Sequence, residues 1–172
     1  MKQNYSDFQI RAMEKVKQLW HMYIVNPEPA RLEHAFKTMP ENLLMIGTGR
    51  HEFYKNLNEF LTGMSSDQIE ARDIQFEFQD EWYDALKISD DICVVFGSIW
   101  VREKVMPGKA VLVDMEGSRF TIVCRDLGEQ VEICSIHHSM PYLDQGETSI
   151  TRNPWPHLQM KRLKRTKSWS AG

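Results

Sequence analysis

The sequence contains no apolar run that approaches the roughly 18–20 residues needed to cross a bilayer. Its first residues, MKQNYSDF, lack the apolar stretch of a secretory signal peptide. Cysteine is scarce: Cys93, Cys124 and Cys134 are an odd number without a CxxC spacing, and all three fall in expected strands. The sequence therefore predicts buried, reduced thiols in a cytoplasmic protein.

Acidic residues are absent after Glu147, although the whole chain has a net charge of −3. The last 25 residues hold six basic residues, which leaves 15 basic and 24 acidic residues in positions 1–147. An acidic body does not suggest a nucleic-acid-binding surface. We expect residues 144–172 to form a basic C-terminal extension or linker. Contact with a membrane surface, or docking onto the body or a second copy, are the alternatives.

Helical spacing predicts three helices before residue 66. Ser6 is a favourable N-cap and Gln9 completes a capping box, so the first helix begins there and ends at Asn26-Pro27. A second helix is expected from Pro29 to Pro40. The third is expected from His51, with its apolar side formed by Phe53, Leu57, Phe60, Leu61 and Met64.

Alternating, β-branched segments dominate the rest of the chain. Besides a brief strand at Leu43–Ile46, strands are expected at 74–82, 92–103, 109–116, 119–126 and 130–139. Helices followed by a meander of long strands indicate an α+β fold, with the helices packed on one face of a curved antiparallel sheet.

The last two strands form an expected hairpin around a turn at Leu127–Gly128. Because side chains alternate along a strand, Arg119 and Thr121 share a face of the first strand, and His137 and Ser139 share a face of the second. The opposite faces carry Phe120, Ile122, Cys124, Ile136 and His138. A set of polar side chains in an apolar sheet is a candidate site.

This hairpin resembles the closing hairpin of the nuclear transport factor 2-like (NTF2-like) superfamily. That superfamily includes SnoaL-like (polyketide-cyclase-like) domains, ketosteroid isomerases and the association domain of calcium/calmodulin-dependent protein kinase. Its final strand typically reads as a tryptophan followed by an HxHxS-type run. His137 and Ser139 match the second histidine and the serine of that run, whereas Ser135 and Val131 replace the first histidine and the tryptophan.

The resemblance extends to the strand–helix junction around Ile46-Gly47-Thr48-Gly49, with Glu52 and Phe60, and covers about residues 5–143. It implies a cone-shaped NTF2-like (cystatin-like) domain at residues 1–143, with three N-terminal helices on the curved sheet. It also implies a pocket between sheet and helices, and a homodimer formed through the outer face of the sheet.

Arg119 and His137 are the residues expected to bind a ligand. An arginine offers a planar fork of donors to a carboxylate, and a neutral histidine adds one hydrogen bond. Thr121, Ser139, Trp82 and Trp100 complete the expected ligand-binding set. The alternative is that Arg119 pairs with Asp114 and His137 is a satisfied core histidine, or that the polar set faces solvent. For Trp82 and Trp100, the alternative is a place in the core or in a dimer interface.

Metal binding is not expected, because adjacent His137 and His138 point to opposite faces of a strand and cannot chelate together. No cofactor is indicated. The apolar stripe of Phe120, Ile122, Ile136 and Met140 is expected to pack against a second copy of the chain.

The predicted function is that of a dimerising, small-molecule-binding module, sensory or accessory, for a small polar or anionic organic ligand. The first alternative is a SnoaL-like lyase, cyclase or isomerase acting on a hydrophobic carbonyl compound, whose catalytic residues the sequence does not identify. The second alternative is an assembly-only module, which predicts a closed and fully packed interior.

Overall fold

A computed structural model describes residues 4–25, 39–49, 52–70, 74–105, 108, 111 and 113–140. The helices are α1 (Asp7–Trp20), the π-helix η1 (His21–Val25) that continues it, and α3 (Leu57–Glu70). The strands are β1 (Leu44–Ile46), β2 (Phe53–Tyr54), β3 (Phe76–Lys87), β4 (Ile92–Glu103), β5 (Asp114–Asp126) and β6 (Val131–Ser139). None of the described helices is both long and apolar enough to span a membrane.

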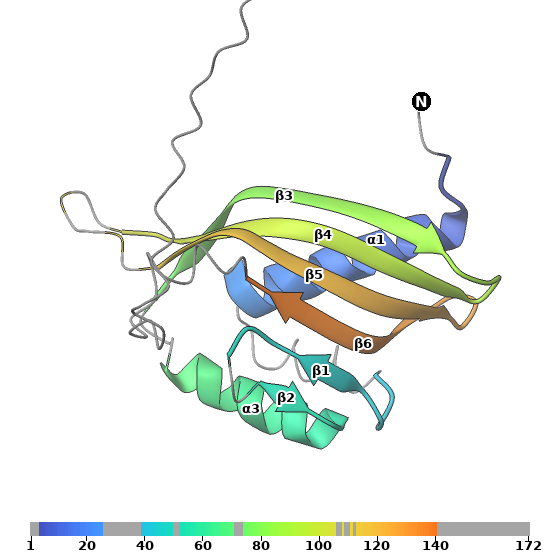
Figure 1. Ribbon diagram of the computed structural model, residues 1–172, viewed down its shortest axis with the longest axis horizontal. Coiled ribbons are helices and arrows are strands. Elements are labelled where there is room, and N and C mark those ends of the chain that lie inside the picture. Colours follow the sequence, from blue (N-terminus) through green and yellow to red (C-terminus); the bar gives the residue numbers. More distant parts are fainter. Residues whose placement is uncertain are drawn as a thin grey trace, which may run out of the picture.

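The strands form one six-stranded sheet in the order β2-β1-β6-β5-β4-β3. Figure 1 shows the four long strands side by side, with α1 along one face of them and α3 beside β2. The α+β fold and the closing hairpin are confirmed: β5 and β6 pair antiparallel around a turn at Gly128, whose φ of 87° favours glycine. One pairing differs from the expected antiparallel sheet, because β1 runs parallel to β6.

The core lies between α1 and the inner face of the sheet. From α1 it takes Phe8, Ala12, Val16, Leu19 and Trp20. From the long strands it takes Cys93, Val95, Ile99, Val101, Phe120, Ile122, Cys124, Ile133 and Ile136. On β4 the burial alternates strictly residue by residue, as expected for a strand with one face in the core.

Polar contacts fix the start of α1 on the sheet. The capping box at Ser6 and Gln9 is present, as the sequence predicts. The Gln9 side chain also donates to the carbonyl of Ala85 at 2.7 Å, and the Arg11 guanidinium reaches both carboxylate oxygens of Asp126 at 3.0–3.1 Å. The helix is thereby held against both β3 and the β5–β6 turn.

The described residues contain two α-helices rather than the expected three N-terminal ones. The second expected helix, 29–40, falls almost wholly outside the described residues. The third begins at Leu57 and not at His51, because Phe53 and Tyr54 pair with β1 and the Asn56 side chain then caps the helix by accepting from the Glu59 amide at 2.9 Å.

Two of the expected strands are in fact one. Segments 109–116 and 119–126 were predicted separately, but β5 runs unbroken from Asp114 to Asp126. Gly117, with a φ of 75°, lies where the β4–β5 register shifts between Ile99 and Val101. A glycine that lets a strand bend at a bulge therefore has the same sequence signature as a turn.

Candidate functional site

Trp20 is the centre of an aromatic cluster on the inner face of the sheet. It is the last residue of α1 and is 2% exposed. Its ring centroid lies 4.9 Å from that of His138, 5.4 Å from that of Phe120 and 6.4 Å from that of Tyr23. The rings are tilted against one another, an arrangement that aromatic pairs prefer to a face-to-face stack.

A buried hydrogen bond lies beside this cluster. His138 on β6 bonds through Nε2 to the hydroxyl of Ser118 on β5, which is fully buried. Ser98 on β4 in turn donates to the Ser118 carbonyl at 3.0 Å. Burial lowers the pKa of His138 to about 4, with Glu52 opposing the shift and His137 adding to it. The imidazole is therefore neutral at pH 7.

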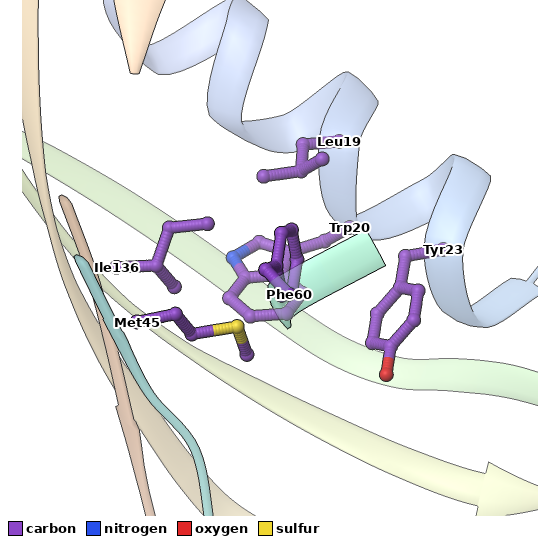
Figure 2. Close-up of a pocket in the computed structure, with 6 residues that line it drawn as sticks. All are labelled: Leu19, Trp20, Tyr23, Met45, Phe60 and Ile136. Carbon is purple, nitrogen blue, oxygen red and sulfur yellow. The ribbon is translucent and has the colours of Figure 1, made fainter. Parts of the chain in front are cut away.

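A small hollow opens next to Trp20. Its volume is about 10 Å³, close to the minimum for one water molecule. It is lined by Leu19, Trp20, Tyr23, Met45, Phe60 and Ile136, as Figure 2 shows. These side chains come from α1, η1, β1, α3 and β6, so the hollow lies where the layers of the fold meet.

One polar atom of Trp20, a residue that lines the hollow, has no hydrogen-bond partner within the described residues. Trp20 Nε1 is buried and finds no acceptor in the part of the chain that the structure describes, so its N–H is unpaired there; Figure 2 shows this nitrogen on the edge of the ring that faces Ile136. Leaving a buried donor unpaired costs about 1–3 kcal/mol, and such groups are rare in folded proteins. The surface of the hollow is wholly apolar, so an acceptor can reach Nε1 and remove this cost only when neighbouring side chains move.

Arg119, Thr121, His137 and Ser139 share one face of the hairpin, as expected: Thr121 lies opposite His137 and Arg119 lies opposite Ser139. That face, however, is the outer one. Arg119 and His137 are exposed, and Thr121 and Ser139 are half-buried. The expectation that these residues line an inner pocket is wrong, because the opposite face buries Phe120, Ile122 and Ile136 against α1.

The two tryptophans of the expected set also lie on the outer face. In the register of the sheet, Trp82 is opposite Ser98, and Ser98 is opposite Arg119. Trp82 is 53% exposed, and Trp100 donates through Nε1 to Asp114 at 2.5 Å. The structure thus brings all six expected residues to one face, but none of them to the hollow beside Trp20.

Glu81 forms an ionic cluster on the side of the sheet that carries α1. Its carboxylate accepts from Lys17 and His21, each at 2.8 Å, and from the Tyr83 hydroxyl at 3.1 Å. Burial alone would raise the pKa of Glu81, but these three hydrogen bonds outweigh it and lower the pKa. A carboxylate with three donors is a weak base, so this cluster joins α1 to β3 and does not suit proton abstraction.

The inner site has limited catalytic capacity. His138 has the charge state that a general base needs, but a pKa of about 4 makes it a weak base and its Nε2 is already bonded to Ser118. Across the described stretches of chain, no three His, Cys, Asp or Glu side chains are close enough to hold a metal ion.

The inner residues Trp20, His138 and Ser118 were absent from the residues predicted to form the site. The sequence placed His138 on the face opposite His137, and this placement is correct. The missing step was the choice of the inward face. The strictly apolar alternation of Cys93, Val95 and Ile99 on β4, carried across to β5 and β6, is the signal that identifies it.

No protein-family model and no curated protein matches the sequence. Solved structures do match it. Aln2 from a Streptomyces species has a TM-score of 0.60 at 9% identity, over 81% of this chain and 94% of its own. A candidate dehydratase of the NTF2-like family from Streptomyces avermitilis has a TM-score of 0.59 at 13% identity, over 79% of this chain and 99% of its own.

A third match is a candidate calcium/calmodulin-dependent protein kinase II association domain from Xanthomonas campestris. Its TM-score is 0.55 at 14% identity, over 77% of this chain and 87% of its own. Identities this low carry information about fold and not about activity. The matches nevertheless agree with the resemblance in the closing hairpin. The chain has the fold of the NTF2-like superfamily.

Proposed function

We propose that the chain binds a small, uncharged and largely apolar organic molecule in the hollow beside Trp20. The observation that carries this proposal is the buried Nε1 of Trp20, which has no hydrogen-bond partner among the described residues. A carbonyl or ether oxygen of the ligand accepts its hydrogen bond, and the rest of the ligand packs on the apolar lining.

The chemistry of the lining decides between a neutral and an anionic ligand. None of the six lining side chains carries a charge, and nearby His138 is neutral. An anion placed there would lose its hydration without gaining a cation. The expectation of a ligand held by Arg119 and His137 is therefore replaced by one of an uncharged ligand with a single acceptor.

Binding requires the lining to open. A hollow of about 10 Å³ holds at most one water molecule, so any organic ligand must displace side chains. Tyr23, on η1, is only partly buried, and π-helical turns inside α-helices occur frequently at functional sites. The movement we propose is an outward rotation of Tyr23 that enlarges the space between Trp20 and Phe60.

The proposal is tested with a matched pair of probes, cyclohexanone and methylenecyclohexane, which differ in the acceptor oxygen. The sequence has five tryptophans, and the indole N–H signal of Trp20 in a nitrogen–proton correlation spectrum is assigned by its loss in Trp20→Phe. We expect cyclohexanone to shift this signal in a saturable way and methylenecyclohexane to leave it nearly in place.

Trp82→Phe is the matched control, since Trp82 lies on the outer face and is 53% exposed. This variant should bind cyclohexanone as the unchanged chain does. Equal responses to the two probes, or no response of the Trp20 signal at saturating cyclohexanone, would show that the indole N–H does not bind an acceptor.

A second candidate function is assembly through the outer face of the sheet as a homodimer. Two observations favour it: the inner hollow is very small, and Leu44, Ile46 and Phe53 are 41%, 39% and 49% exposed at the β1–β2 edge. The surface differs from the one first expected, because Phe120, Ile122 and Ile136 belong to the core. Met140 is half-buried.

Light scattering coupled to size-exclusion chromatography tests the assembly. We expect the unchanged chain to elute at twice the mass of one chain. Ile46→Asp should elute as a monomer, whereas Ile88→Asp, which alters an exposed residue in the β3–β4 turn, should remain a dimer. A monomeric unchanged chain would exclude this candidate.

A further inference from the structure

Strand β3 presents an acidic and apolar strip on the outer face of the sheet. Asp80, Trp82, Asp84 and Leu86 alternate along it and share that face, since their partners on β4 are Trp100, Ser98, Phe96 and Val94. Trp82 is 53% exposed and Leu86 is 54% exposed. Because β3 is an edge strand, this strip borders open solvent on its outer side within the described residues (Figure 1).

The negative charges of the strip are not neutralised by a cation of the described residues. The Asp80 carboxylate accepts from the Glu81 amide at 2.9 Å. That of Asp84 accepts from the Tyr5 hydroxyl at 2.9 Å and the Ala85 amide at 2.7 Å. All three donors are uncharged. A partner that brings cations and apolar side chains together would therefore complement the strip.

The chain carries such a segment itself. Residues 152–169 contain six basic residues, no acidic residue, and large apolar side chains at Trp155, Leu158, Leu163 and Trp169. We propose that this segment docks, within the same chain, onto the strip formed by Asp80, Trp82, Asp84 and Leu86.

The geometry of the sheet places the start of the segment within reach. Strand β6 ends at Ser139, which lies in one row with Arg119, Ser98 and Trp82 across the sheet. Three strand spacings of about 4.8 Å separate the ends of this row by roughly 14 Å. The chain from Met140 to Trp155 can extend several times that distance at about 3.3–3.6 Å per residue.

The charges along this row favour docking of the basic segment at the β3 edge of the sheet, the edge far from Ser139. Arg119 is exposed beside β6 and repels a basic segment, whereas Asp80 and Asp84 at the opposite edge attract it. A second copy of the chain is the competing occupant. It would bring another acidic body, with 24 acidic and 15 basic residues in positions 1–147, toward the same carboxylates. The basic segment is the better electrostatic match.

Carbodiimide cross-linking of the full-length chain tests the docking, because it couples a carboxylate directly to a lysine amine. We expect cross-links from Asp80 or Asp84 to Lys161, Lys164 or Lys167, identified by mass spectrometry. The Lys87–Asp90 ion pair, at 2.7 Å, is an internal positive control. In a mixture of light and nitrogen-15 chains, the tail cross-links should join residues of the same isotope.

Substitutions of exposed apolar side chains distinguish docking on the strip from random collisions between a charged tail and the surface. Trp82→Ala should lower the ratio of docked to free segment roughly tenfold, the effect expected of losing one buried aromatic contact. Ile88→Ala removes a similarly exposed apolar side chain outside the strip and should change nothing. The Lys87–Asp90 cross-link should persist in both variants.

Three outcomes would overturn the proposal. The first is a tail cross-linked equally to an exposed acid outside the strip, such as Glu129. The second is tail cross-links that join light and heavy chains, which would assign the strip to a second copy. The third is a chain that shows the Lys87–Asp90 cross-link without any tail cross-link. The side chains of Trp82 and Ile88 are both exposed at the surface, so the Trp82→Ala and Ile88→Ala chains should both fold.

Discussion

Mild acid should destabilise this fold through one side chain, His138. Its pKa is about 4 in the folded chain because its ring is buried against Trp20. In the unfolded chain a histidine titrates near 6.5. A group whose pKa is lowered by folding contributes stability that is complete above its unfolded pKa, and this contribution is lost as the pH falls.

The size of the effect follows from the two pKa values. Between pH 7 and pH 5 the unfolded chain takes up roughly 0.7 of a proton at this histidine and the folded chain roughly 0.1. The difference, integrated over this range, lowers the free energy of unfolding by about 2 kcal/mol. Part of His138 remains exposed as a residue, so this is the upper end of the effect. The loss continues until the pH approaches the folded pKa of about 4.

Urea unfolding followed by far-ultraviolet circular dichroism at pH 7, 6 and 5 measures this slope. His138→Gln does not titrate and retains an amide that can reach Ser118. We therefore expect its pH 7 to pH 5 difference to be smaller than that of the unchanged chain by about 2 kcal/mol. His137→Gln is the control: His137 is exposed on the outer face and is only the smallest cause of the lowered pKa of His138, so its loss should leave most of the slope.

Retention of the full slope by His138→Gln would show that some other group carries it. Loss of the slope in His137→Gln would likewise contradict the role of His138. A carboxylate would give a pH dependence of the free energy of unfolding at lower pH than His138 does. Glu81, for example, has a lowered pKa and loses its stabilising charge only when the pH falls below the usual range of a glutamate.

Three further changes test the packing and the capping, each by urea unfolding at pH 7. Gly97→Ala places a Cβ about 2.5 Å from the backbone oxygen of Trp82 and 2.2 Å from the Phe120 ring, and should lower the free energy of unfolding by about 1–3 kcal/mol; an unchanged value would mean that the sheet yields there. Ser6→Ala removes the N-cap of α1 and should cost about 1 kcal/mol. Glu81→Gln should cost about 1 kcal/mol, a difference that shrinks as the pH falls and the Glu81 carboxylate of the unchanged chain takes up a proton.

Much of the framework could be predicted from local patterns. Strand β4 begins and ends at the expected Ile92 and Glu103, and the capping box at Ser6 sets the start of α1. These features depend on side chains close in sequence. The β1–β2 pair could not be found in this way, since Phe53 and Tyr54 fit a helical stripe equally well and only the pairing with β1 makes them a strand.

The candidate site was predicted on the wrong face for a reason of the same kind. Alternation correctly separated Arg119 and His137 from Phe120 and His138, but a single strand does not show which of its faces meets the helices. That choice depends on the total apolar area of each face across all strands, together with α1. Once Val95, Ile122 and Ile136 pack on Trp20 and its helix, the arginine face must lie outside.

The irregularity in the closing hairpin has a consequence for tracing the ancestry of this chain. Strand β5 pairs Val123 with Ser135 and Cys124 with Ile133, so Cys134 is an extra residue in β6. The buried isoleucines Ile133 and Ile136 are consequently three positions apart instead of two. A distant relative that lacks this insertion would align with Ile133 against a surface residue. Sequence searches in which one-residue gaps inside strands are heavily penalised would then miss it, although the two folds superpose.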